Sequence, residues 1–144
     1  MRLVLDTNVV VSALLWDGAP KRLLKACHSE GILLFTSTPL LEELTETLSK
    51  KKLERKIAAS LLSADQLINF YAELVSVVRP VFVPRLAPDP DDDVVIGTAL
   101  AAKANIVVTG DRTLLSVTEY EGVRIVSVSE ALDAVAQSAS QKNQ

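Results

Sequence analysis

Four acidic residues stand beside apolar segments of this 144-residue chain. Asp6 and Asp111 each follow a short apolar run, Glu43 lies in a leucine-rich segment, and Asp93 begins another apolar segment. If the short runs are parallel strands, their carboxyl ends share one edge of a sheet, where open α/β folds bind ligands. Carboxylate oxygens are the ligands that Mg²⁺ and Mn²⁺ prefer, and crowded carboxylates repel one another without a cation. The positions therefore indicate a divalent-metal site.

A simpler structural interpretation exists for these acids. Asp6 can cap a following helix, although Thr7 and Asn8 bring more polar groups to that strand exit than one cap requires. Asp111 follows a sharp Thr109-Gly110 turn and can serve as a turn or cap residue. Four independent caps would also explain the four acids, so periodicity alone leaves both interpretations open.

The acids at 91–93 open a helical pattern, where negative side chains favourably oppose the helix dipole. Asp93 lies three and four residues before Ile96 and Gly97, which predicts an inward-facing side chain. Asp92 is the second choice for this role.

Glu43 is selected in a similar way from the acids in residues 42–46. The leucines at 40, 41, 44 and 48 form one face of a helix. A period of 3.6 residues places Glu46 opposite that face and Glu43 nearest its border. Glu43 is therefore the best candidate in this segment, against the alternative of a solvated surface acid.

The elements that must position these acids alternate between strand and helix patterns. Expected strands cover residues 3–5, 32–35, 75–83, 106–108 and 124–126, and Pro80 places the third at a sheet edge. Expected helices lie between them, with a capping box at Ser63–Gln66 and with Asp89 as a candidate cap. This alternation favours a three-layer α/β/α fold with a central parallel sheet of four to five strands.

Length and composition predict one globular domain. Because 49% of the residues are hydrophobic and only 4% are aromatic, the core must be aliphatic. We expect the domain to span residues 1–137, followed by a frayed polar tail at 138–144. With no signal peptide or membrane-length apolar run, we expect a cytoplasmic protein without a membrane partner.

The single Cys27 and the single His28 are not expected to do chemistry. Cys27 lies on the apolar side of a helical pattern, which predicts a buried small side chain rather than a reactive thiol. His28 has no second His or Cys partner for a zinc site, so a surface position at a helix end is expected.

Four segments carry a family resemblance. They are residues 3–9 (LVLDTNV), 37–44 (STPLLEEL), 89–96 (DPDDDVVI) and 108–111 (VTGD). In this order they resemble the motifs of the PIN-domain family of metal-dependent ribonucleases. The closest branch is that of toxin components of bacterial toxin–antitoxin pairs. The similarity covers nearly the whole chain and implies a three-layer PIN-like fold.

The resemblance assigns roles to individual residues. Asp6, Glu43, Asp93 and Asp111 match the catalytic, metal-binding acids, and the supporting positions are Thr7, Asn8, Thr109 and Asp92. Thr113 stands where many members have a further acid, which puts a fifth carboxylate in doubt. The implied reaction is hydrolysis of an RNA phosphodiester with one or two Mg²⁺ or Mn²⁺ ions.

An acidic protein that acts on RNA must concentrate its cations locally. The net charge is −3 and the pI is about 5.2, so no global attraction to nucleic acid is expected. Candidate phosphate contacts are Arg112, Lys21, Arg22 and Lys25. The five basic residues within 50–56 are a further candidate, although a solvated helix end explains them more simply.

The resemblance also implies partners, namely a cognate antitoxin and a second copy of the chain in a homodimer. Two other functions compete with the ribonuclease interpretation. A Mg²⁺-dependent phosphohydrolase of another α/β family would need an Asp two residues after Asp6, where this chain has Asn8. A noncatalytic PIN-like interaction module would use the acids only as caps or weak metal ligands.

Overall fold

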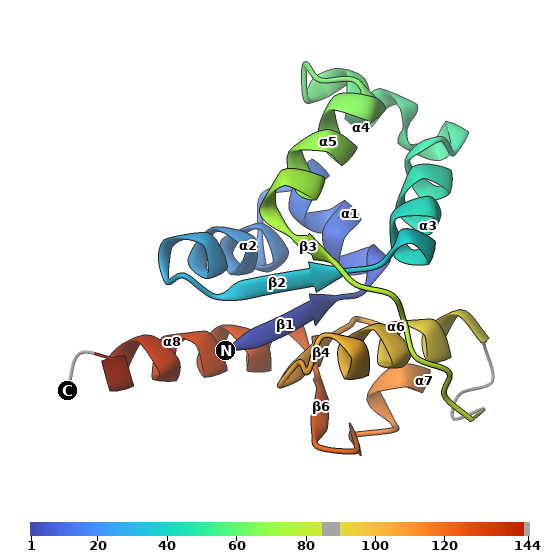
Figure 1. Cartoon of the computed structure of the whole chain (residues 1–144). Helices are drawn as coiled ribbons and strands as arrows, with labels where there is room; N and C mark the ends of the chain where they lie inside the picture. The colour runs from blue at the N-terminus through green and yellow to red at the C-terminus, as the bar shows by residue number, and fades with distance from the viewer. Residues whose placement is uncertain (85–89, 143–144) are drawn as a thin grey trace.

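The computed structural model describes residues 1–84 and 90–142, which form one sheet with helices on both faces (Figure 1). The strands are β1 (Arg2–Leu5), β2 (Leu33–Thr36), β3 (Ser76–Val77), β4 (Ile106–Val108), β5 (Glu119–Tyr120) and β6 (Val123–Val126). Their order across the sheet is β3-β2-β1-β4-β6-β5, and every neighbouring pair is parallel except β5 and β6. The predicted three-layer α/β/α fold is confirmed, although the sheet has six strands, one of them antiparallel, instead of the expected four to five parallel strands.

The helices connect the strands in the expected alternation. They are α1 (Thr7–Leu15), α2 (Ala19–Ser29), α3 (Thr38–Leu48), the 3₁₀ helix η1 (Lys51–Leu53), α4 (Glu54–Ala59), α5 (Ala64–Leu74), α6 (Pro90–Ala101), α7 (Arg112–Leu115) and α8 (Val128–Lys142). The capping box of Ser63 and Gln66 at the start of α5 is present as predicted, whereas Asp89 lies outside the described residues. None of the helices in the described residues is long and apolar enough to span a bilayer.

The sheet divides the core in two because successive strand side chains point to opposite faces. On β1, Leu3 and Leu5 pack into a cluster with apolar residues of α1, α2, α3, α5 and α8. Val4, between them, packs into a second cluster that contains residues of α6 and α7. The molecule therefore has three layers, and both clusters are mainly aliphatic.

The strand order contains a reversal that bears on function. From β1 the chain moves outward to β2 and β3, and then returns to place β4 on the other side of β1. The junction between β1 and β4 is thus a topological switch point, the position at which open α/β sheets bind ligands. Leu5 lies opposite Val108 in the register, so the residues that follow these two strands meet there.

The third strand is much shorter than the sequence predicted. Within 75–83 only Ser76 and Val77 pair with β2, at the expected sheet edge. Pro80 has no amide hydrogen to donate, and the Val81 amide donates instead to the Gly97 carbonyl of α6 at 3.1 Å. Residues 78–84 therefore cross α6 (Figure 1) instead of extending the sheet. The antiparallel β5, only two residues long, was not predicted.

The prediction of a frayed tail at residues 138–144 was wrong through residue 142. The helix α8 continues to Lys142, since no Gly or Pro interrupts this segment and Ser138 and Ala139 are partly buried. The proposed domain end after residue 137 is thus not marked by the end of a helix. The short elements η1, α4 and α7 were also not predicted.

Cys27 and His28 lie as expected. The Cys27 side chain is fully buried, and burial raises the pKa of its thiol to about 11. The thiol is therefore protonated at neutral pH and acts as a small core side chain. His28 is exposed in the last turn of α2.

The close contact between α6 and residues 78–84 gives a stability prediction. A Cβ atom at Gly97 would collide with the Val81 carbonyl oxygen. Helix propensity favours Ala by about 1 kcal/mol, but overpacking costs about 1–3 kcal/mol, so Gly97→Ala should lower the free energy of unfolding. Urea denaturation measures the change. Gly110→Ala, where a Cβ atom has ordinary space, should be near neutral. Equal stability of the two variants would contradict the packing described here.

Candidate active site

Seven polar or charged side chains are buried within the described residues: Asp6, Thr7, Thr36, Ser37, Asp92, Thr98 and Thr109. Four of them end or directly follow the parallel strands β1, β2 and β4, Thr7 begins α1 beside Asp6, and the other two belong to α6. Burying a polar group costs free energy unless hydrogen bonds compensate it. This concentration at the switch point is therefore the candidate functional site of the molecule.

Asp6 is held by hydrogen bonds to both of its carboxylate oxygens. The Thr109 hydroxyl donates to Oδ2 at 2.7 Å, and the Thr7 amide donates to Oδ1 at 2.8 Å. Its own amide donates to the Val108 carbonyl at 2.9 Å. Asp6 is 6% exposed and Thr109 is fully buried. Asp6 thus caps α1 and also places a fixed carboxylate at the switch point.

Thr109 connects Asp6 to the second acid, Asp111. The hydroxyl that donates to Asp6 also accepts the Asp111 amide at 3.0 Å. Asp111 Oδ1 accepts from the amides of Thr113 and Leu114 at 2.7 and 3.4 Å, which caps α7. Asp111 Oδ2 makes no hydrogen bond to the described part of the chain. The capping interpretation of Asp111 is therefore correct, and one oxygen is still available for a cation.

These residues lie on the side of the sheet that α6 covers. Val4 and Val107 face the cluster of α6, and strand alternation gives Asp6 and Thr109, two residues later, the same direction. The Ser37 hydroxyl lies 2.9 Å from the Thr98 hydroxyl of α6 and joins β2 to this helix.

Ser37 and Thr98 were not among the predicted site residues. The available signals were a serine directly after a strand and a polar residue in an otherwise apolar helix.

The orientation predicted for α6 was wrong by one residue. Asp92 is 7% exposed, whereas Asp93 is partly exposed and lines a depression of about 410 Å³ against residues 80–83. Asp92 lies three, four and seven residues before the buried Val95, Ile96 and Ala99, the spacing of one helix face. The acid that faces the sheet in the first turn of α6 is therefore Asp92.

Glu43 lies at the rim of the site. It is partly buried while Glu42 and Glu46 are exposed, as the helical period predicted. With Asp91 it lines a depression of about 210 Å³ between α3 and α6. Glu43 is thus close to the first turn of α6.

The remaining predicted residues divide between the site and the opposite face. Thr7 is buried beside Asp6. The side-chain amide nitrogen of Asn8 lies near Gly110, at 3.9 Å from the position that a Cβ atom on Gly110 would occupy. Arg112 is exposed directly after Asp111. Three further cations, on α2, pack on the other side of the sheet: Lys21, Arg22 and Lys25. Lys21 pairs with Asp17 at 3.4 Å.

The acidic side chains at the site are chemically suited to bind a hard divalent cation. Asp6, Asp92, Asp111 and Glu43 offer carboxylate oxygens, the preferred ligands of Mg²⁺ and Mn²⁺, and two of them, Asp6 and Asp92, are buried. In residues 1–84 and 90–142, no three acidic, His or Cys side chains are arranged closely enough to hold an ion as they stand. Binding by three carboxylates therefore requires a rim side chain, Asp111 or Glu43, to turn inward.

Comparison with protein families identifies the class of this fold and site. The family model of the PIN domain matches residues 2–113, which include all four motifs, and the chain belongs to the PIN-domain family. PIN domains are generally nucleases that bind RNA, and they typically use divalent metal ions. Comparison with curated protein sequences gives no match.

The role of Thr109 can be tested through stability. Thr109→Val keeps the side-chain shape but removes the hydroxyl bonded to Asp6 and Asp111. We expect the free energy of unfolding to fall by about 1.5–3 kcal/mol, the range for hydrogen bonds to charged groups. The matched control is Thr113→Val, whose side chain is exposed and which should change stability by less than about 0.5 kcal/mol. Indistinguishable urea midpoints for the two variants would refute the structural role of the hydroxyl.

Proposed function

We propose that this protein is a divalent-metal-dependent endoribonuclease that hydrolyses RNA phosphodiester bonds. The observation that carries the proposal is the set of buried polar side chains, including Asp6 and Asp92, on elements that meet at the switch point, where α6 packs on β1 and β4. Membership of the PIN-domain family supports it. The resemblance to toxin components supports a more specific role as the toxin of a toxin–antitoxin pair.

In this proposal Asp6, Asp92, Asp111 and Glu43 hold Mg²⁺ or Mn²⁺, with Asp92 in the place first assigned to Asp93. A bound ion supplies a hydroxide nucleophile and neutralises charge that develops on the phosphate.

The chain's own residues position these ligands and the substrate. The Thr109 hydroxyl orients the Asp6 carboxylate and fixes the backbone at Asp111. The amide of Thr7 completes the hydrogen bonding of Asp6, and Asn8 lies exposed beside it. Arg112, exposed next to Asp111, is positioned to bind the scissile phosphate.

The competing functions are less well supported. The phosphohydrolase alternative lacks its second Asp, because Asn8 occupies that position. A noncatalytic module that uses its acids only as caps does not need an acid of the first turn of α6 to be buried, whereas Asp92 is only 7% exposed. The endoribonuclease proposal accounts for both features.

The decisive variants are Asp92→Asn and Asp93→Asn. They are adjacent and isosteric, and they remove the same charge from the same helix turn, so only the direction of the side chain differs. We expect Asp92→Asn to lower the rate of RNA cleavage by about 10²-fold or more, as loss of transition-state charge stabilisation does, and Asp93→Asn to retain most activity. Cleavage of a panel of structured RNAs with Mn²⁺ measures both. Loss of activity in Asp93→Asn alone would restore the original assignment.

Metal dependence has its own controls. EDTA should abolish cleavage by the wild type, and millimolar Mn²⁺ should raise its melting temperature because ion binding stabilises the folded state. The double variant Asp6→Asn/Asp92→Asn should lose that rise. EDTA-resistant cleavage, or the same rise in the double variant, would exclude the proposed centre.

A toxin in this family branch needs a protein partner, and we propose a cognate antitoxin and a second copy of the chain. A groove of about 650 Å³ between α1, α2 and α5 offers apolar surface, including Phe70 and Leu62, which are 51% and 42% exposed.

Light scattering at micromolar concentration should give twice the 15.5 kDa chain mass. A monomeric mass would exclude the homodimer. A neighbouring reading frame that encodes no small DNA-binding protein would count against the toxin role.

A further inference from the structure

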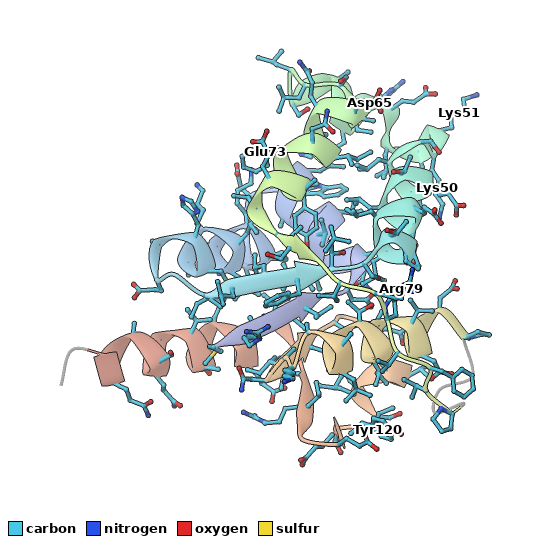
Figure 2. The ribbon with its side chains drawn as sticks, viewed as in Figure 1. Lys50, Lys51, Asp65, Glu73, Arg79 and Tyr120 are labelled. Carbon is cyan, nitrogen blue, oxygen red and sulfur yellow. The ribbon has the colours of Figure 1, made fainter. Side chains whose placement is uncertain are left out.

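The strongest positive segment of this acidic chain lies outside the candidate active site. Residues 50–56, here called the basic cluster, contain five basic residues and one acid, although the whole chain has a net charge of −3. The cluster covers η1 and the start of α4, and Figure 2 shows Lys50 and Lys51 at the end of α3 that is remote from the sheet. It is therefore a local reversal of the molecule's charge.

The cluster is built on packed structure, which distinguishes it from a frayed, solvated helix end. Leu53, at its centre, is 7% exposed and belongs to the core cluster of α1, α3 and α5. The Lys56 ammonium lies 5.3 Å from the ring centroid of Trp16, at the end of α1. These contacts fix the backbone that carries the exposed cations Lys50, Lys51, Lys52 and Arg55.

The exposed cations of the cluster make no ion pair with any residue in the described part of the chain. The neighbouring acid Glu54 is exposed and forms no salt bridge there. Cations held on a fixed scaffold without acidic partners are available to an external anion.

The helix α3 connects the basic cluster to the candidate active site. Glu43, in its second turn, lines the depression with Asp91 of α6, and the helix ends five residues later at Leu48. At about 1.5 Å per residue, the cluster begins roughly 10 Å from Glu43 along the helix axis. Salt screens charges beyond about 8–10 Å at physiological ionic strength, so the cluster has little effect on the site through its field alone. To act on the same ligand, it must contact it directly.

We propose that the basic cluster binds the phosphate backbone of single-stranded RNA whose scissile phosphate lies at the Asp6–Asp92 site. This rests on the proposed nuclease function and adds to it the path of the substrate, from the site along α3 to the cluster. A positive surface that follows the backbone, with an exposed aromatic ring beside it, is the usual arrangement for binding single strands. Trp16, 42% exposed, supplies such a ring.

The test compares two double variants that remove the same charges. Lys51→Gln/Arg55→Gln neutralises two exposed cations of the cluster, and Lys103→Gln/Arg124→Gln neutralises an exposed pair near the opposite, amino edge of the sheet. Fluorescence anisotropy in EDTA with a labelled 20-nucleotide oligouridine measures binding without cleavage. Thermal melts verify that both doubles fold.

The Lys51→Gln/Arg55→Gln variant of the basic cluster should bind the 20-mer on the order of tenfold more weakly. The slope of the logarithm of its binding constant against the logarithm of the salt concentration should become less steep by about 1.4, about 0.7 for each lost phosphate contact. The control double should bind like the wild type. In cleavage assays with Mn²⁺, the cluster double should show a raised KM with unchanged kcat. An equal loss in both doubles, or none in the cluster double, would overturn the proposal.

The outcomes separate this inference from the nuclease proposal. Normal cleavage with no effect of the cluster double would overturn the RNA path alone. Cluster-dependent RNA binding without cleavage in Mn²⁺ by the wild type would support RNA binding by the cluster, but it would overturn the nuclease proposal and with it the assignment of a scissile phosphate. Binding of polyglutamate, but not of RNA, through the cluster would show that its partner is an acidic protein and overturn the RNA assignment.

Discussion

The hydrogen bond from the Thr109 hydroxyl to Asp6 is the interaction on which the arrangement of the site depends. A buried carboxylate without partners costs many kcal/mol, so its position must be secured by the surrounding fold. Here the partners come from two directions: the amide of Thr7, because α1 begins at once, and the hydroxyl of Thr109, because β4 pairs with β1 in one register. A shift of that register by one residue would turn Thr109 to the other face and leave Asp6 without its hydroxyl partner. The register, the start of α1 and the turn to Asp111 are therefore constrained together.

The first turn of α6 presents three consecutive acids to three different environments. Asp91 lines the depression with Glu43, Asp92 faces the sheet, and Asp93 faces residues 80–83. The rotation of the helix is fixed by contacts further along, where Gly97 accepts the Val81 amide and Thr98 meets Ser37. A rotation of one residue, about 100°, would exchange the roles of these acids, so the identity of the buried one depends on packing five and six residues further along the helix.

This dependence marks the limit of what the sequence could predict. The strands β1, β2, β4 and β6 were predictable because short aliphatic runs ended at polar turns, and Glu43 could be selected from a well-defined leucine face. Asp92 could not be selected in this way, because α6 is apolar almost all round and the sequence does not show which face turns inward. That face depends on residues 78–84, which cross the helix and are bonded to it through the Val81 amide and the Gly97 carbonyl. The two-residue β5 and the four-residue α7 are stabilised by tertiary contacts and carry too few residues for any periodic signal. The site as a whole was predictable as a set of acids at one sheet edge, but its hydrogen bonds through Thr109 and Ser37 were not.

The distribution of charge suggests how an acidic protein can act on a polyanion. Glu42, Glu43, Glu46 and Asp91 line one small depression at the rim of the site, and two further carboxylates, Asp6 and Asp92, are buried. Two like charges 4 Å apart repel by about 1 kcal/mol in water and about 4 kcal/mol near a protein surface, so phosphate and carboxylates at this site oppose each other until a cation lies between them. Apart from Arg112 at the rim, further cations within the site would pair with these acids and reduce their affinity for the ion. A basic cluster one helix away avoids that conflict, because screening over roughly 10 Å lets it hold RNA without weakening the site's affinity for the ion. On this proposal the separation of the two charged regions by α3 is what makes both a metal site and an RNA-binding surface possible in one small domain.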